Sequence, residues 1–284
     1  MKLSVESGIF KTLTHRERLK MIKDAGFDAV DFSLFSLSGE NAELIGENYA
    51  ECAEELRRYM EDIGIEACQA HAPFEMTAAD PISPECPKYV RLTRAIEAAG
   101  ILGAPYIVVH CIKASGEEFL RINREFYLSL LPYAERVGIK IAVENLFGPA
   151  DENGVRPDYF GDPAEHLAFV RSLGSPYFTV CVDLGHSALV GRRPEDVIRA
   201  MDPELFMLMH MHDNDCKDDL HRIPYSALFD WSAICAALKE IGYRGGISLE
   251  LIGHFRALPK ELHADALKYA ERVGRRIIAM CSGE

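Results

Sequence analysis

The stretch Val180-Cys181-Val182-Asp183-Leu184-Gly185-His186 is a short apolar run that ends on a carboxylate and, three residues later, an imidazole. An apolar run of this length, rich in β-branched residues, is typical of a buried strand. Leu184-Gly185 supplies a turn, and Asp183 and His186 must each find a partner because buried polar groups are costly when unpaired. Taken alone, the stretch favours an Asp that caps the turn beside a hydrogen-bonded His. The same pattern, an apolar run that ends on a carboxylate or an imidazole, recurs along the chain, and this recurrence favours a functional interpretation.

Eight short apolar runs are present, and each is followed by a segment with helical periodicity. They lie at Leu3–Phe10, Ala29–Phe35, Ile65–Ala70, Tyr106–Cys111, Ile139–Leu146, Phe178–Asp183, Leu205–His212 and Gly246–Ile252. Eight strand–helix alternations predict an α/β protein with a parallel sheet closed into a single (β/α)8 TIM barrel. With 284 residues, 48% hydrophobic content and no linker, we expect one domain spanning residues 1–284.

Several predicted helices carry start signals. Thr14-His15-Arg16-Glu17 has the capping-box pattern, and Asp162-Pro163-Ala164-Glu165 combines an N-cap acid with Pro at the first helical position. Ser83-Pro84-Glu85 has a similar pattern, and a long helix is expected from about Glu40 to Asp62.

Two connections exceed the usual length of a few residues: Phe74–Pro84 and Phe147–Gly161. Both follow the carboxyl ends of predicted strands, so we expect both to overhang the same face of the barrel. Long loops in a compact domain are usually functional. These loops therefore belong to the region in which a site is expected.

Composition and charge exclude several classes of protein. The net charge of −13 disfavours binding to a nucleic-acid backbone. The N-terminus lacks the apolar stretch of a signal peptide and nowhere do eighteen apolar residues run together, so we expect a cytoplasmic protein without a membrane partner. Eight cysteines are scattered without CxxC pairs, which predicts neither a disulfide framework nor a zinc knuckle.

Polar side chains collect at the ends of the predicted strands: His71, His110, Glu144, Asp183, His186, His210, His212 and Glu250. In a barrel all of these meet at the C-terminal mouth. Side chains along a strand point alternately to its two faces. Ile141, Val143 and Val182 occupy the alternate positions to the polar strand-end residues or flank them, so the polar and apolar side chains are expected on different faces. Carboxylates and imidazoles that converge from different strands are what a divalent-metal site requires.

Each of these residues also has a plain structural interpretation. A single strand-end His is more often a hydrogen-bonded packing residue than a ligand. The histidines within helical segments are expected at the surface: His15, His166 and His263. Glu144 and Glu250 are different, because an unpaired carboxylate at the end of a buried strand is costly. Two such Glu residues together with Asp183 and a His favour a metal site over coincidence.

Seven motifs together resemble the xylose-isomerase-like TIM-barrel superfamily. They are His71-Ala72-Pro73-Phe74, Val108-Val109-His110, Ala142-Val143-Glu144-Asn145-Leu146, Cys181-Val182-Asp183-Leu184-Gly185-His186, His210-Met211-His212-Asp213-Asn214, Asp219-Leu220-His221 with Trp231 downstream, and Ser248-Leu249-Glu250. This superfamily includes sugar and sugar-phosphate isomerases and epimerases, and the endonuclease IV type of abasic-site nuclease. The resemblance covers essentially the whole chain.

The resemblance implies a ligand set and a set of substrate contacts. The residues that match the four metal ligands of tagatose/psicose-type ketose epimerases are Glu144, Asp183, His210 and Glu250. His210 is preferred to His212 because Asp213 follows it at the spacing of the family. His186 matches a substrate-contacting His, and the positions that hold additional zinc ions in the nuclease branch are His71, His110, Asp219 and His221.

One departure from the family pattern lies downstream of Asp219. Relatives often carry a Pro-Gly-x-Gly turn where this chain has Pro224-Tyr225-Ser226-Ala227. The departure predicts a different loop shape and a His221 displaced from ligand geometry, which favours a single bound ion. Basic residues near the strand mouths are candidates for holding a phosphate or acid group, with solvated surface charge as the alternative: Lys113, Arg156, Lys217, Arg222 and Arg256.

These patterns predict a metal-dependent sugar or sugar-phosphate isomerase or epimerase of carbohydrate metabolism, acting on a small polyhydroxylated carbonyl compound. Its reaction would pass through a metal-stabilised enediolate, with Glu144 and Glu250 as the acid/base pair. One divalent ion is expected, Mn²⁺ or Zn²⁺ first, with Mg²⁺ or Co²⁺ also compatible with the ligands. The expected substrate-binding residues are His71, His110, His186, Asp219 and His221.

Two alternatives of different classes remain. The first is an endonuclease IV-like abasic-site nuclease with a multi-zinc site, and the net charge of −13 together with the lack of a Lys/Arg-rich run opposes it. The second is a non-catalytic metal- or sugar-binding barrel. The sequence also leaves a homo-oligomer open.

Overall fold

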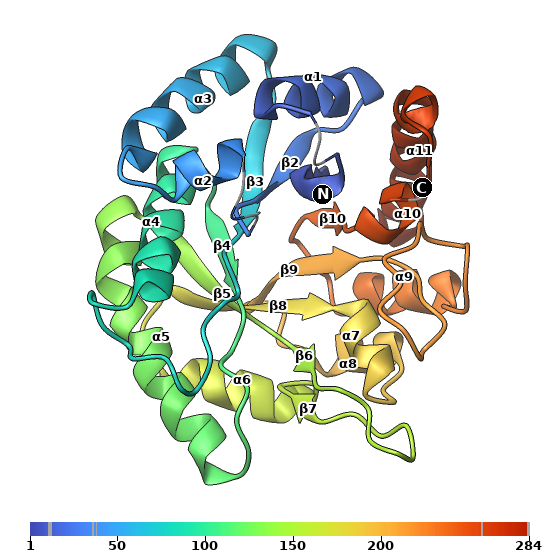
Figure 1. Cartoon of the computed structure of the whole chain (residues 1–284). Coiled ribbons are helices and arrows are strands. Elements are labelled where there is room, and N and C mark those ends of the chain that lie inside the picture. The colour runs from blue at the N-terminus through green and yellow to red at the C-terminus, as the bar shows by residue number, and fades with distance from the viewer. Residues whose placement is uncertain (11–12, 36, 38, 257, 283–284) are drawn as a thin grey trace.

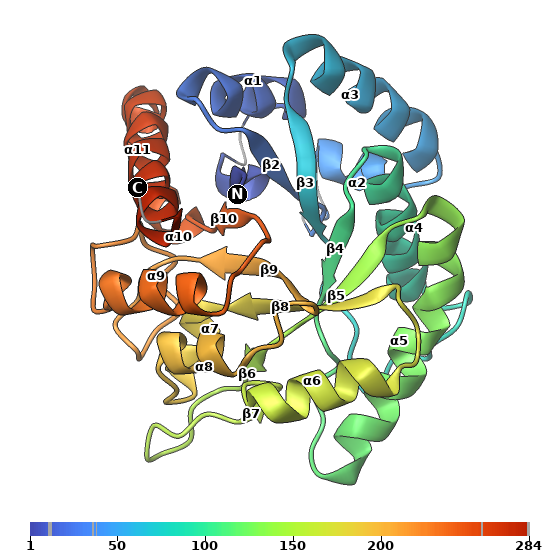
Figure 2. The same ribbon diagram turned by 180° about the vertical axis from the view of Figure 1, so that it is seen from behind.

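The computed structural model describes residues 1–10, 13–35, 37, 39–256 and 258–282. Within these residues, parallel strands close into a barrel in the order β1-β10-β9-β8-β5-β4-β3-β2, and helices surround it (Figure 1 and Figure 2). The predicted single TIM barrel is confirmed. None of the helices in the described ranges is both long enough and apolar enough to cross a membrane.

The barrel strands are β1 (Leu3–Glu6), β2 (Ala29–Ser33), β3 (Glu66–His71), β4 (Tyr106–Val109), β5 (Lys140–Glu144), β8 (Phe178–Asp183), β9 (Phe206–Met211) and β10 (Ile247–Leu249). Each begins within one residue of its predicted start. Most end earlier than predicted, because the last residues of the apolar runs already turn into the mouth. The predicted overhanging loop after β5 contains a small antiparallel sheet of β6 (Leu146–Phe147) and β7 (Asp158–Tyr159).

The helices are α1 (His15–Ala25), α2 (Glu40–Leu44), α3 (Tyr49–Ile63), α4 (Pro87–Ile101), α5 (Glu117–Val137), α6 (Pro163–Ser172), α7 (Leu184–Leu189), α8 (Pro194–Ala200), α9 (Trp231–Glu240), α10 (Ile252–Arg256) and α11 (His263–Ser282). Short 3-10 turns occur at Ser7–Ile9 (η1) and Lys260–Leu262 (η2). The predicted capping box forms at α1, where Thr14 Oγ1 accepts the Glu17 N–H at 3.2 Å. Asp162 caps α6 as predicted.

Two helix predictions need correction. The helix expected from Glu40 to Asp62 is divided into α2 and α3 by a turn that contains Gly46. Gly is unfavourable inside a helix by about 1 kcal/mol relative to Ala, which is consistent with a break at this position. Helix α4 begins at Pro87 rather than near Ser83, because the Ser83 hydroxyl accepts the Glu85 N–H within a local turn instead of capping the helix.

The helix histidines expected at the surface are also corrected. His15 is 5% exposed and packs near the Phe32 ring, and His166 is fully buried with Nε2 placed 3.0 Å from the Val143 carbonyl oxygen. His263 is partly buried and stacks on Phe10. These residues lie on the helix faces that contact the rest of the fold, and a periodic pattern alone does not show which face a polar residue occupies.

The inward-facing strand residues determine where the polar ends lie. Val108, Ala142, Cys181 and Leu208 form an apolar cluster inside the barrel. Side chains alternate along a strand, so Glu144, Asp183 and His210, each two residues beyond a member of this cluster, continue the inward series. Ile141, Val143 and Val182 belong instead to the large core that includes the helices, which confirms the predicted separation.

The buried His166 predicts a pH dependence of stability. Burial lowers the pKa of His166 to about 4, whereas an unfolded His has a pKa near 6.5. Between these values the unfolded chain binds the proton and the folded chain does not, so stability falls as pH drops from about 6.5 to 4, by roughly 3 kcal/mol. We expect His166→Gln, measured by urea unfolding at several pH values, to lose this part of the slope.

His263→Gln is the matched control, because His263 is another helix histidine that is only partly buried. It tests whether the change in slope is specific to His166. An unchanged slope in His166→Gln would contradict the assignment of the slope to His166.

Candidate metal centre

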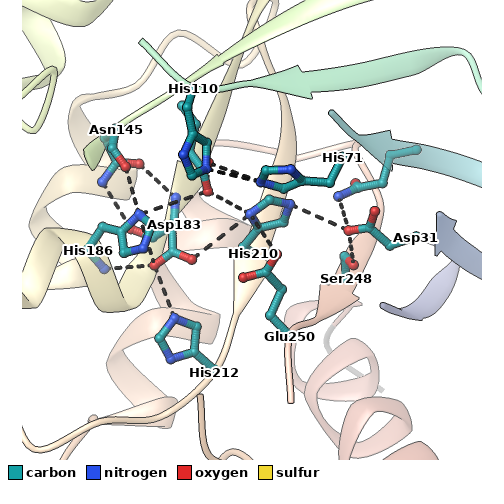
Figure 3. Close-up of polar contacts among 12 residues, drawn as sticks. Asp31, His71, His110, Asn145, Asp183, His186, His210, His212, Ser248 and Glu250 are labelled. Atoms are coloured by element: carbon teal, nitrogen blue, oxygen red, sulfur yellow. Dashed lines mark hydrogen bonds and ion pairs between the residues drawn. The ribbon is translucent and has the colours of Figure 1, made fainter. Parts of the chain in front are cut away.

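The polar strand ends meet at one mouth of the barrel, as Figure 3 shows. Glu144 and Asp183 are the last residues of β5 and β8, His210 lies on β9, and Glu250 directly follows β10. Glu144 is 1% exposed, Glu250 is 6% exposed, and Asp183 and His210 are fully buried. The pairing of β8 with β9 sets Asp183 beside His210. Four side chains distant in the sequence are thus held on rigid strands around one point.

That point is Nδ1 of His210. It lies 2.7 Å from Glu144 Oε1, 3.4 Å from Glu250 Oε1 and 4.0 Å from Asp183 Oδ2. The structure therefore brings together the four residues predicted as ligands, while their role as ligands stays a prediction.

A second group lies against the other oxygen of Glu144. His110 Nε2 lies 2.9 Å from Glu144 Oε2, and His71 Nε2 lies 3.7 Å from the same atom. Burial lowers the pKa of His110 to about 4, so this imidazole is neutral at neutral pH. His71 and His110 are thus placed to contact a ligand from the β3 and β4 side of the mouth.

A third group forms on the β8 and β9 side. His221 Nε2 lies 3.0 Å from Asp219 Oδ2, and His186 Nε2 lies 3.7 Å from the same oxygen. The His212 ring stacks on the His221 ring at 4.2 Å, and His212 Nε2 lies 3.2 Å from Asp183 Oδ1. The expectation that the unusual turn displaces His221 is corrected, because His221 lies within ligand distance of Asp219 and His186.

The pKa values of Glu144 and Glu250 are shifted in opposite directions. Burial raises the pKa of Glu250 to about 8, against the opposing effect of His210 and His221. Burial acts in the same direction on Glu144, but His210 and His110 outweigh it and hold the pKa of Glu144 well below its usual range. Two carboxyl groups whose pKa values are pushed apart are suited to different proton-transfer roles.

The donor set fits a divalent cation. Asp183 Oδ2 is buried and has no hydrogen-bond partner among the described residues. Its other oxygen is used locally, since Asp183 Oδ1 accepts the His186 N–H at 2.7 Å and caps α7. A buried carboxylate oxygen without a partner is costly, and a divalent cation between Asp183, Glu144 and Glu250 would bind this oxygen and offset most of the charge of the three groups. One nitrogen and several oxygens suit Mn²⁺, Zn²⁺, Mg²⁺ or Co²⁺.

Two residues of the mouth, Glu6 and Asn145, lie outside the set predicted from the sequence. Glu6 ends β1, is 3% exposed and accepts the Ile252 N–H through Oε1 at 2.7 Å. It is a strand-end acid like Glu144, but the first apolar run in the sequence continues past it to Phe10. The sequence pattern indicates no role for Asn145, yet its Oδ1 accepts the Asp183 N–H at 2.7 Å and fixes the end of β8 against β5.

A cavity of about 500 Å³ opens above these groups. Its lining residues are Glu6, Phe35, His71, Phe74, His110, Lys113, Glu144, Leu146, Phe147, His186, Asp219, His221, Glu250, Ile252 and Arg256. Phe74 and Phe147 belong to the two long connections, which confirms that these loops overhang the mouth. Of the five basic candidates, Lys113 and Arg256 line the cavity.

A closed parallel barrel with buried carboxylates and imidazoles at its C-terminal mouth defines the class of protein: an α/β barrel with a candidate metal centre. Residues 19–273 match the family described as xylose isomerase-like TIM barrel, and the chain belongs to this family. The resemblance seen in the motifs is confirmed.

Individual relatives agree with this assignment. The chain is 27% identical over 265 residues to the uncharacterised protein MJ1311 of Methanocaldococcus jannaschii, with 88% of this chain and 83% of the relative covered. A structure of D-psicose 3-epimerase in the presence of D-fructose has a TM-score of 0.76 at 16% identity, with 98% of this chain and 99% of that chain covered. The IolI protein with a bound zinc atom has a TM-score of 0.73 at 17% identity, with coverages of 100% and 99%. At these identities the structural likeness shows the fold.

Gly185 has a different role from the predicted turn. It lies inside α7, where an added Cβ would meet His212 Cε1 at 2.0 Å and Nε2 at 2.4 Å. Gly185→Ala should push the His212 ring away from Asp183 and destabilise the protein by about 1–3 kcal/mol, as overpacking of buried sites does. Urea unfolding of the variant measures this loss.

Gly246→Ala is the matched control, because the nearest atom to its added Cβ is a carbonyl oxygen at 3.7 Å, an ordinary contact. This control should unfold close to the wild-type midpoint. A Gly185→Ala variant as stable as the wild type would contradict the steric role of Gly185.

Proposed function

We propose that the protein is a metal-dependent isomerase or epimerase of a sugar or sugar phosphate. The observation that carries the proposal is the pair Glu144 and Glu250, which approach one imidazole nitrogen, have pKa values shifted in opposite directions and line a cavity of about 500 Å³. Similar structures that act on sugars, such as D-psicose 3-epimerase, support this substrate class.

Glu144, Asp183, His210 and Glu250 would hold one divalent ion, Mn²⁺ or Zn²⁺ first and Mg²⁺ or Co²⁺ otherwise. The bound ion would supply a Lewis acid that polarises a carbonyl oxygen of the substrate. The zinc atom bound by the similar IolI protein supports a metal at this kind of site. The residues that would orient the substrate through its hydroxyl groups are His71, His110, His186, Asp219 and His221.

The two Glu residues would move the proton. One of Glu144 and Glu250 takes the proton from the carbon next to the carbonyl group, and the other returns a proton. Return to the opposite face of the same carbon gives epimerisation. Return to the neighbouring carbon, together with transfer of the hydroxyl proton from the adjacent oxygen to the former carbonyl oxygen, gives aldose–ketose isomerisation.

The endonuclease alternative has one observation in its favour. The groups His71–His110–Glu144 and His186–Asp219–His221 each present three donor atoms within 4.8 Å of one another. Phosphate displacement is the chemistry for which several adjacent metal ions are used. The net charge of −13 opposes binding to a DNA backbone, so the sugar-directed activity is favoured, and the number of bound ions tests the choice.

Glu144→Gln and Glu250→Gln should each lower turnover by roughly 10²-fold or more, because each removes a proton acceptor and a charge from the ion site. The assay is a screen of ketoses and aldoses in D₂O with added Mn²⁺, read by NMR. The wild type should convert a sugar and incorporate deuterium at the reacting carbon, and removal of the metal by a chelator should stop both.

Glu97→Gln is the matched control, because Glu97 is also a buried carboxylate but pairs with Arg136 between α4 and α5, away from the mouth. It should keep wild-type turnover. Conversion at the full rate after chelation would contradict the metal mechanism, and conversion without solvent-derived hydrogen would contradict proton transfer by the Glu pair.

A further inference from the structure

Asp31 is a buried carboxylate that lies beside the His210 ring of the candidate metal centre (Figure 3). It sits inside β2, is 1% exposed and does not line the cavity. Its Oδ2 accepts hydrogen bonds from Gln69 Nε2 on β3 at 2.7 Å and from Ser248 Oγ on β10 at 2.9 Å. The carboxylate is therefore held by side chains of two other barrel strands.

The same carboxylate faces the far side of the His210 ring. Asp31 Oδ2 lies 3.5 Å from His210 Nε2, whereas Nδ1 of the ring faces Glu144. Among the described residues, His210 Nε2 and Asp31 Oδ1 are both buried without a hydrogen-bond partner. Buried polar atoms are nearly always paired, and the Asp31 carboxylate, with Oδ2 at 3.5 Å, is the acceptor placed beside His210 Nε2.

We propose that Asp31 is a positioning residue that accepts the Nε2–H of His210 and so keeps Nδ1 free to bind the metal ion. A neutral imidazole carries one proton, and the nitrogen without it is the ligand. Metal-binding histidines commonly give their other N–H to a carboxylate, which fixes the tautomer and the ring orientation. The inference rests on the proposed function, because it requires an ion at the site of Glu144, Asp183, His210 and Glu250.

The geometry separates this role from a packing role. A purely structural role, through the hydrogen bonds from Gln69 and Ser248, would change the stability of the protein and not the choice of the His210 nitrogen that binds the metal. Because Asp31 does not reach the cavity, its removal should change the metal affinity and the ring of His210 and leave the substrate KM at saturating metal unchanged.

The test measures metal binding without substrate. Asp31→Ala and Asp31→Asn are compared with the wild type and with Glu97→Gln, and the Kd for Mn²⁺ is obtained by competition with a chelator. Asp31→Ala should raise the Kd about 10- to 100-fold. Asp31→Asn should raise it less, because the amide oxygen still accepts the Nε2–H, and Glu97→Gln should leave it unchanged.

NMR of the Zn²⁺-loaded protein with ¹⁵N-labelled histidine provides the second readout. The wild type should show His210 with its proton on Nε2 and the metal on Nδ1, and this proton should exchange faster in the Asp31 variants. A proton on Nδ1 would overturn the proposal. If Asp31→Ala does not fold, Asp31→Asn, which keeps the side-chain volume, decides the outcome.

The results also separate this inference from the proposed function. Folded Asp31 variants that bind Mn²⁺ as tightly as the wild type would overturn the role of Asp31 and leave the proposed metal site standing. A wild-type protein that binds no ion would overturn both.

Discussion

Three buried carboxylates that point at one imidazole nitrogen are the constraint on which the rest of the structure depends. Glu144, Glu250 and Asp183 approach His210 Nδ1 within 2.7, 3.4 and 4.0 Å. Ionised carboxylates gathered around one atom in a poorly solvated site repel one another. They persist only if protons or cations neutralise them and if the scaffold prevents them from moving apart.

The closed barrel supplies that scaffold. Each carboxylate is fixed at a strand end by the parallel ladder, and local hydrogen bonds then set its orientation, as Asn145 does for the Asp183 backbone. The apolar cluster of Val108, Ala142, Cys181 and Leu208 lies inside the barrel, two residues before the polar ends on β5, β8 and β9. The stability of the core thereby supports a mouth in which several buried ionisable groups lie close together.

The sequence predicts the barrel well and the mouth in part. Strand starts such as Tyr106 and Phe178 are marked by apolar runs, and residues at strand ends share a mouth by topology, so Glu144, Asp183, His210 and Glu250 gather without further information. The role of Asp31 cannot be predicted in this way because Asp31 lies inside its strand. The orientation of its buried carboxylate depends on partners in other strands, such as Gln69. The burial of His166 cannot be predicted because helical periodicity shows which residues share a helix face and not whether that face points toward the barrel.

The number and position of bound ions test the central claim most directly. Metal analysis of protein purified without a chelator, combined with anomalous diffraction at the zinc and manganese edges, measures both. The account predicts one ion, bound by Glu144, Asp183, His210 and Glu250, because a small sugar needs only one Lewis acid at its enediolate. Two or more fully occupied ions, with His71 and His110 among their ligands, would contradict it and favour phosphoester chemistry.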